Sequence, residues 1–241
     1  LHRPRGGASP TPALLWIHGG GYVLGNPAQD DRLCRRFAKE LGITVAAVEY
    51  RLAPKNPYPA GLEDCYAALT WLAQLPTVDP ARVAIGGASA GGGMTAALAQ
   101  LARDRAEVTL AAQVLVYPML DDRTVGPEHD DPGHKLWTQG SNGFGWRVYL
   151  GGADPETAVP ARNPDLSGLP PAWIGVGTLD LFHDEDLAYA QRLREAGVPC
   201  EVKTVDGAFH GFDLIAPKTR VSQEFFNEQA AMLRRVFNSS V

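Results

Sequence analysis

Residues 87–91 read GASAG, and this stretch decides which fold we expect. It follows the short apolar segment Arg82–Gly86 and precedes a helical pattern of apolar residues that starts at Met94. A serine with glycines two positions on either side is typical of a strained strand-to-helix turn, where close packing pushes the serine hydroxyl outward. The stretch predicts a nucleophilic Ser89 on an α/β scaffold. A pattern of only five residues also occurs by chance, so a glycine-rich turn without a catalytic role is the alternative.

A second glycine-rich stretch, HGGG at 18–21, follows the apolar segment Ala13–Ile17. Successive glycines adopt backbone conformations that other residues resist, so their N–H groups can turn toward one point and form a nest for an oxyanion. A flexible loop is the alternative for this stretch alone. Because it is paired with a serine turn in the matching order, the oxyanion nest is favoured.

Short apolar segments alternate with longer segments of helical period, which is typical of βαβ units around a parallel sheet covered on both faces. We expect strands at Ala13–Ile17, Ile43–Val48, Arg82–Gly86, Leu110–Val116, Ala172–Val176 and Glu201–Val205. We expect apolar helix faces at 62–72, 94–101 and 226–237. A chain of 241 residues is long enough for one sizeable domain and short for two, so we expect a single α/β domain over 1–241.

The segment 121–145 interrupts this alternation. It mixes charges, glycine and proline with the apolar residues Leu136, Trp137 and Phe144. A long irregular segment inside a compact domain is usually a functional lid or pocket wall, or else disordered. We therefore expect 121–145 to be a lid or pocket-wall insertion.

An acid and a histidine that complete a serine triad should follow the serine in that order, each at the end of a strand. Asp180 follows the expected strand Ala172–Val176, and His210 follows the expected strand Glu201–Val205. Glycines flank the histidine in GAFHGF at 207–212, which indicates a loop rather than a core position. Asp184 remains an alternative acid because it lies one helical turn past Asp180.

Composition excludes several classes of partner. With 22 basic and 27 acidic residues the formal net charge is −5, so no basic surplus is present to bind nucleic acid or an anionic membrane. No apolar run approaches about 18 residues, and we expect no stable membrane insertion. Cys34, Cys65 and Cys200 are odd in number and far apart, which favours a reducing, cytoplasmic location over a disulfide framework.

The sequence predicts no cofactor and no metal. Residues 91–96 match a dinucleotide-binding spacing after a strand, but the next expected strand runs into Tyr117 instead of an acid. Acidic and histidine residues gather in 128–134 and 183–186, but their spacing is not that of zinc or hard-ion ligands. We expect these charges to lie on the surface.

Several longer motifs occur together with HGGG and GASAGG: YRLAP at 50–54, LEDCYAAL at 62–69, DPARVAIGG at 79–87, NPDLSGLPP at 163–171, DLFHDED at 180–186 and HGF at 210–212. In this combination the chain resembles the hormone-sensitive-lipase-like esterases over nearly its whole length. The resemblance implies the α/β-hydrolase fold. Residue 88 is Ala where that family commonly has Asp or Thr. Family members usually carry a helical N-terminal cap and early strands before the region where this chain starts, so we expect these to be absent from the chain.

By the same resemblance, Ser89 is the nucleophile, Asp180 and His210 complete the triad, and the oxyanion hole consists of the backbone N–H groups of Gly20, Gly21 and Ala90. This implies a serine carboxylesterase that cleaves short- to medium-chain acyl esters through an acyl-enzyme and needs no cofactor.

Apolar and aromatic side chains near the expected site favour a small-molecule ester with an acyl or aryl group. The substrate-binding candidates are Tyr22, Trp137, Phe144 and Phe212. Two alternatives stay open: a protein on the same fold that binds a small ligand without cleaving it, and an amide or lactone hydrolase with the same triad. A homodimer also stays open.

Overall fold

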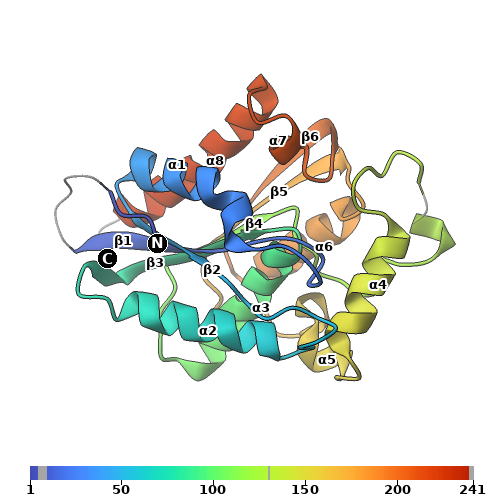
Figure 1. Cartoon of the computed structure of the whole chain (residues 1–241), viewed down its shortest axis with the longest axis horizontal. Coiled ribbons are helices and arrows are strands. Elements are labelled where there is room, and N and C mark those ends of the chain that lie inside the picture. The colour runs from blue at the N-terminus through green and yellow to red at the C-terminus, as the bar shows by residue number, and fades with distance from the viewer. Residues whose placement is uncertain (5–9, 130, 239–241) are drawn as a thin grey trace.

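A computed structural model of the chain describes residues 1–4, 10–129 and 131–238. Within these ranges the strands are β1 (Thr11–Ile17), β2 (Thr44–Val48), β3 (Val78–Ala88), β4 (Ala112–Val116), β5 (Ala172–Leu179) and β6 (Cys200–Phe209). They form one parallel sheet in the order β2-β1-β3-β4-β5-β6 (Figure 1). The six expected strands and the α/β fold class are confirmed.

The longer helices are α1 (Asp31–Leu41), α2 (Ala60–Ala73), α3 (Ala90–Arg105), α4 (Gln139–Leu150), α6 (His183–Glu195) and α8 (Arg220–Asn238). The short ones are η1 (Pro27–Asp30), η2 (Pro127–His129), α5 (Pro155–Ala158), η3 (Pro160–Arg162) and α7 (Phe212–Ile215). Helices α1 and α8 cover one face of the sheet, and α2, α3 and α6 cover the other (Figure 1).

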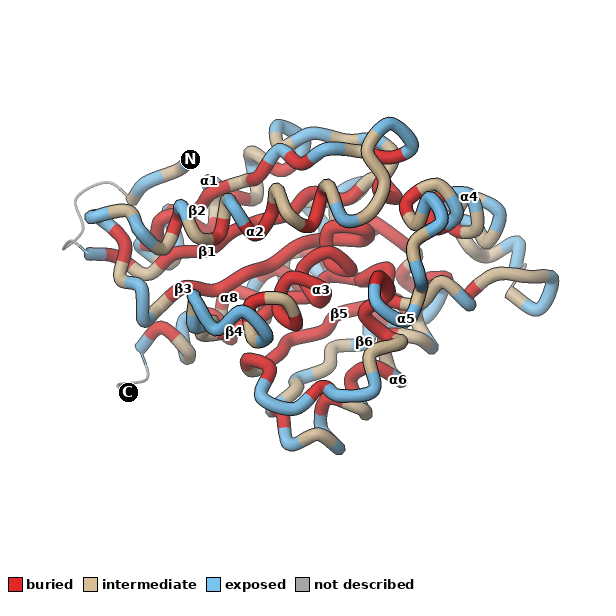
Figure 2. The backbone as a smooth tube through the Cα atoms, turned by 90° about the horizontal axis from the view of Figure 1, so that it is seen from below, coloured by how far each residue is buried: buried red, intermediate tan, exposed pale blue. Residues whose placement is uncertain are grey.

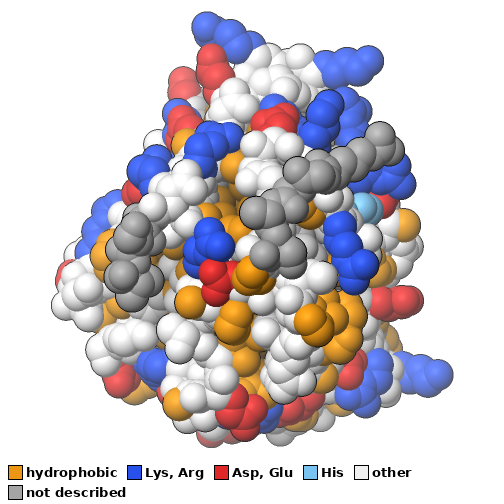
Figure 3. Space-filling view, turned by 90° about the vertical axis from the view of Figure 1, so that its left-hand side faces the viewer, with side chains coloured by type: hydrophobic (Ala, Val, Ile, Leu, Met, Phe, Trp, Pro, Cys, Tyr) orange, Lys and Arg blue, Asp and Glu red, His pale blue; other side chains and the backbone are white. Residues whose placement is uncertain are grey.

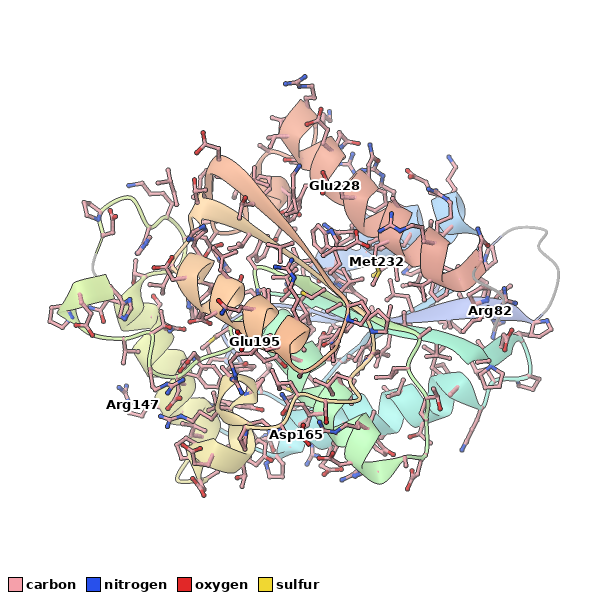
Figure 4. All side chains as sticks on the ribbon, turned by 180° about the vertical axis from the view of Figure 1, so that it is seen from behind. Arg82, Arg147, Asp165, Glu195, Glu228 and Met232 are labelled. Carbon is pink, nitrogen blue, oxygen red and sulfur yellow. The ribbon has the colours of Figure 1, made fainter. Side chains whose placement is uncertain are left out.

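The sheet is the buried centre of the molecule (Figure 2). Strands covered by helices on both faces need apolar side chains on both faces, which is why they are continuous apolar runs. In β1, Ala13, Leu15 and Ile17 belong to the core on the α2–α3 side, whereas Leu14 and Trp16 belong to the core on the α1–α8 side. Met232 shows the same arrangement for α8, since its buried side chain points toward the sheet (Figure 4).

The expected apolar stripes lie on α2, α3 and α8, whereas α1, α4 and α6 were not predicted. Helix α1 is dominated by charged residues and buries only Cys34, Phe37 and Ala38. A stripe this narrow is hard to separate from a charged loop in the sequence. Its Phe37 ring packs on Phe226 of α8 with ring centroids 4.8 Å apart, so tertiary contact holds α1 on the sheet.

Strands β5 and β6 are longer than expected, and the extra residues matter for the site. Strand β5 continues to Leu179 and β6 to Phe209, and these two residues pair in register after an irregularity. Asp180 and His210 therefore start their loops directly at paired strand ends. Gly177 and Gly207 lie in these extensions and hid them, because glycine disfavours the interior of a strand.

The segment 121–145 consists of turns, the short helix η2 and the first half of α4. Asp130 within it lies outside the described residues. Helix α4 starts with Gln-Gly-Ser-Asn-Gly, and glycine lowers helix propensity enough to hide this start. The Thr138 side chain caps the helix by accepting a hydrogen bond from the Ser141 N–H.

The outer edge of β2 is paired at one point. The His2 N–H donates to the Val45 carbonyl at 2.8 Å, and the Val45 N–H donates to the His2 carbonyl at 2.9 Å. The bridge is antiparallel, unlike the pairing inside the sheet. Position 45 of this edge is therefore not open to another strand.

The end of the molecule where β1 and β3 begin lies opposite the strand ends that carry Ser89 and His210. Among the described residues at this end, Lys and Arg side chains are interspersed with Asp and Glu side chains (Figure 3). Among the described helices, none is both long enough and apolar enough to cross a bilayer.

Candidate active site

Ser89 lies in the tight turn between β3 and α3. Its backbone has φ 59° and ψ −124°, a conformation that non-glycine residues seldom adopt and that is typical of functional sites. Both glycines of the motif are needed for space. A Cβ atom at Gly87 would lie 2.4 Å from the Gly91 carbonyl oxygen, and one at Gly91 would lie 2.1 Å from the Ile17 carbonyl oxygen. The GASAG pattern is therefore explained by backbone crowding around the serine.

The backbone of Ser89 is held from β4 and the loop that follows it. The Ser89 N–H donates to the Val116 carbonyl at 2.9 Å, and the Ser89 carbonyl accepts from the Met119 N–H at 3.0 Å. These bonds keep the strained turn in place and leave the side chain free to face the histidine.

His210 lies between the serine and an acid. Its Nε2 is 2.9 Å from the Ser89 Oγ, and its Nδ1 is 2.8 Å from the Asp180 Oδ2. The other carboxylate oxygen of Asp180 accepts the Phe182 N–H at 3.0 Å. The exposed fractions of Ser89, His210 and Asp180 are 8%, 7% and 3%, so these hydrogen bonds are largely shielded from water.

Asp184, the alternative acid, faces away from this group. Its side chain is 98% exposed and pairs with the neighbouring His183 at 2.7 Å. Helix α6 begins at His183, and its first turn carries Asp184 to the outside. Asp180 is the acid that the fold brings to His210.

The loop after β1 packs directly on the serine. A Cβ atom at Gly19 would lie 2.8 Å from the Ala88 carbonyl oxygen and 3.2 Å from the Ser89 Cβ. Gly20 and Gly21 have φ values of 126° and 60°, which glycine adopts without strain. Ala90 is the first residue of α3, where free N–H groups and the positive end of the helix dipole favour an anion.

His18 supports this loop. Its ring stacks on Tyr50 with centroids 4.3 Å apart, and its Nδ1 is 2.8 Å from the Gly19 carbonyl oxygen. Burial lowers the pKa of His18, so the ring is neutral at neutral pH. A carbonyl only accepts, so the Nδ1 must carry the proton and donate to Gly19. The sequence placed His18 in the nest but did not predict this bond.

Two aromatic rings that sequence reasoning missed lie against His210. The Tyr117 ring centroid is 4.8 Å from that of His210, and the Phe182 centroid is 5.2 Å away. The Tyr117 hydroxyl donates to the Asp213 Oδ1 at 2.8 Å. Tyr117 directly follows β4 and Phe182 lies two residues past Asp180, so their positions next to strand ends were the available signal.

Glu185 links α6 to the loop after β4. Its Oε1 accepts the N–H groups of Leu120 and Asp121 at 2.7 and 3.1 Å. Burial raises the pKa of Glu185 to about 8, and burial also raises that of Asp186, which is 0% exposed. The prediction that the charges of 183–186 lie on the surface is therefore wrong for Asp186, which the first turn of α6 directs into the core, and Glu185 is half-buried against the loop after β4.

The substrate-binding candidates fall into two groups. Trp137 lies against the loop after β1, since a Cβ atom at Gly21 would be 2.0 Å from its ring. Phe144 is 45% exposed on α4, with the Arg147 guanidinium 5.4 Å from its ring centroid. Arg147 itself points away from the body of the molecule (Figure 4).

Tyr22 and Phe212 are instead placed in the core. Tyr22 is 2% exposed, stacks on Tyr149 at 4.0 Å and donates its hydroxyl to the Met119 carbonyl at 3.1 Å. Phe212 is 5% exposed and packs on Phe225 with centroids 5.0 Å apart. Each follows a site glycine in the sequence, but its side chain turns inward.

The donors near the site are unsuited to a metal. Among residues 1–4, 10–129 and 131–238, no three histidine, cysteine, aspartate or glutamate side chains are grouped so that they could hold an ion. The polar groups in contact with Ser89 and His210 are instead a hydroxyl, an imidazole and a carboxylate, the residue types of a serine nucleophile with a base and an acid.

The chain is similar to known ester hydrolases. Residues 14–214 match the family model of the alpha/beta hydrolase fold. The chain is 38% identical over 227 residues to the carboxylic ester hydrolase LipN of Mycobacterium tuberculosis, and this match covers 88% of the chain and 59% of LipN. It is 34% identical over 209 residues to the ethyl acetate hydrolase of Pseudomonas putida, covering 83% of the chain and 65% of that enzyme.

Among solved structures, a bacterial heroin esterase superposes with a TM-score of 0.93 at 40% identity, over 98% of this chain and 78% of that one. The chain thus spans less than two thirds of LipN and of the ethyl acetate hydrolase, but most of the solved esterase. The chain belongs to the alpha/beta hydrolase fold family, among the hormone-sensitive-lipase-like carboxylesterases that its motifs resemble.

Proposed function

We propose that this chain is a serine carboxylesterase that hydrolyses short- to medium-chain acyl esters of small molecules. The observation that carries the proposal is the pair of hydrogen bonds that His210 makes, 2.9 Å to the Ser89 hydroxyl and 2.8 Å to the Asp180 carboxylate. The esterase relatives support the same reaction class.

In this mechanism His210 is the general base. The Asp180 carboxylate accepts a hydrogen bond from the Nδ1–H of His210, and this tautomer leaves the Nε2 lone pair directed at the Ser89 hydroxyl. Ser89 attacks the acyl carbon while its proton passes to Nε2. The imidazolium then protonates the leaving alcohol as the bond between carbonyl carbon and alkoxy oxygen breaks. Water repeats these steps on the acyl-enzyme, which releases the acid and restores Ser89.

The oxyanion that forms at each tetrahedral stage would be bound by the N–H groups of Gly20, Gly21 and Ala90. These donors belong to a loop and a helix start that are packed against Ser89 before substrate binds, so little reorganisation is needed during the reaction. Loss of one such donor costs about 10²–10³ in rate.

Three further statements belong to the proposal. Residues 1–241 act as one domain, in which 121–145 forms a wall of the substrate pocket and contributes Trp137 and Phe144. The enzyme is cytoplasmic, which agrees with the free thiols of Cys34 and Cys65 in the core. A homodimer stays a prediction that light scattering on the purified chain would check.

Covalent labelling tests the proposal. The purified chain is treated with a fluorophosphonate, the adduct is mapped by mass spectrometry, and hydrolysis of p-nitrophenyl acetate is followed for wild type, Ser89→Ala and His210→Ala. We expect labelling at Ser89 and loss of turnover in both variants, with circular dichroism unchanged. An unlabelled, inactive but folded wild type would indicate the non-catalytic ligand-binding alternative. Faster turnover of amide or lactone analogues than of esters would indicate the alternative of an amide or lactone hydrolase with the same triad.

A further inference from the structure

Residues 135–138, here called the strap, touch the candidate site at two places. A Cβ atom at Gly21 would lie 2.0 Å from the Trp137 ring, and one at Gly211 would lie 3.3 Å from the Leu136 Cδ1. Gly21 belongs to the loop after β1, and Gly211 directly follows His210. Two consecutive side chains of the strap therefore reach two different loops of the site.

The strap crosses over the serine. In the sheet order β2-β1-β3-β4-β5-β6, strands β1 and β6 lie on opposite sides of β3, whose end leads into Ser89. A segment that contacts the loops after both strands must pass across the end of β3. The low exposure of Ser89 and His210, 8% and 7%, agrees with this cover.

Trp137 is held firmly in the strap. Its ring fits beside two glycines, because Cβ atoms at Gly21 and Gly145 would lie 2.0 and 3.5 Å from it. Its Nε1 donates to the Asn142 Oδ1 at 3.2 Å, and the amide of this fully buried asparagine donates to the Thr124 carbonyl at 2.8 Å. Leu136 differs, since it is 60% exposed and has a φ of 66°.

The proposed reaction assigns a different part of the ester to each of the two strap residues, Leu136 and Trp137. His210 must protonate the leaving alcohol, so the alcohol group of the ester lies on the His210 side of Ser89. Leu136 contacts that side, at Gly211. The carbonyl oxygen points into the loop after β1, and the acyl chain leaves the carbonyl carbon away from His210. Trp137 lies against Gly21, apart from the Leu136 contact at Gly211, and we place the acyl chain on this side.

We propose that Trp137 is a specificity-determining residue that limits the length of the acyl chain, and that Leu136 borders the alcohol group. This inference rests on the proposed esterase function. The indole lies against the backbone of Gly21 and near Gly145, and it would lose its hydrogen bond to Asn142 if it withdrew. It therefore acts as a fixed wall, and a longer acyl chain meets it directly.

The test compares p-nitrophenyl acetate with p-nitrophenyl hexanoate and octanoate, with kcat/KM measured for wild type, Trp137→Ala and the milder Trp137→Leu. A pocket wall of this kind discriminates by about 10- to 200-fold, so we expect Trp137→Ala to raise the octanoate-to-acetate ratio at least 10-fold. Trp137→Leu should raise it less. Trp71→Ala is the matched control, because Trp71 is 49% exposed on α2 and should leave the ratio unchanged.

Leu136→Ala separates the two sides of the site. We expect it to alter the preference among acetate esters of different alcohols while keeping the acyl preference of wild type. An unchanged octanoate-to-acetate ratio in a folded Trp137→Leu or Trp137→Ala would overturn the proposal, as would an acyl shift caused by Leu136→Ala alone. Failure of the esterase function itself would look different, since wild type would then show no Ser89-dependent hydrolysis of acetate.

Discussion

Replacing Gly21 by alanine tests how the loop after β1 serves the reaction. Gly21 has a φ of 60°, and an added Cβ atom would lie 2.0 Å from the Trp137 ring. The left-handed backbone costs an alanine about 1–2 kcal/mol, which lowers the melting temperature of a chain this long by roughly 2–8 °C. The collision with Trp137 comes on top of this cost, because the loop or the indole must move.

Gly197→Ala is the matched control. Gly197 has a φ of 79°, and nothing lies within 4 Å of a Cβ atom placed there. It follows α6, away from Ser89. Both variants therefore bear the backbone cost, and only Gly21→Ala disturbs the oxyanion loop. We expect Gly197→Ala to keep the wild-type kcat, and Gly21→Ala to lose about 10²–10³ in kcat, the effect of one misplaced oxyanion donor.

Steady-state hydrolysis of p-nitrophenyl acetate and thermal melts would be measured for both variants and for Gly21→Ala in a Trp137→Ala background. If the collision causes the loss, removing the indole should restore part of the rate, and the two substitutions will not be additive. A Gly21→Ala enzyme within about fivefold of wild type would refute the reasoning, because one lost donor should cost at least about 10². Full additivity would show that Trp137 is not the obstacle.

The remaining predictions concern three aspartates. Asp180→Asn should lower kcat by about 10⁴, because the amide no longer holds the imidazole in the required tautomer, whereas Asp184→Asn should match wild type in the same assay. Burial raises the pKa of Asp30 from 3.8 to about 6, so the stability that its protonated form contributes is fully present below pH 3.8 and is lost as the pH rises through 6. Asp30→Asn keeps an oxygen that accepts the Trp16 Nε1–H and should raise the free energy of unfolding by up to roughly 3 kcal/mol at pH 8, but by little at pH 4. Urea titrations at both pH values check this, and an equal gain at both would contradict the role of burial.

Local patterns were sufficient wherever backbone geometry alone limits the residue type. GASAG predicted the turn at Ser89, and in the structure there is no space for a Cβ atom at Gly87 or Gly91. The six strands were predicted because a sheet covered on both faces requires continuous apolar runs. Helix α1 was missed because its buried stripe is only three residues within a charged segment, and α4 because its start is rich in glycine.

Contacts between distant segments could not be predicted in this way. Tyr22 and Phe212 stand next to site glycines in the sequence, but their side chains turn into the core, because side-chain direction follows the local backbone and the space around it. From the sequence, Glu185 and Asp186 were expected to be surface charges. Their burial depends on the packing of the first turn of α6 against the loop after β4.

The sequence by itself determined the fold class and the family, and it singled out Ser89 and His210 as the candidate nucleophile and base, because these depend on short motifs and on their order along the chain. Only the tertiary structure distinguished Asp180 from Asp184, since the end of β5 brings Asp180 to His210 and the first turn of α6 carries Asp184 into solvent. It alone also placed Leu136 against Gly211 and Trp137 against Gly21. The physical reason is the same in both cases: a motif constrains the backbone near it, whereas the side that a distant side chain faces is set by how the layers pack.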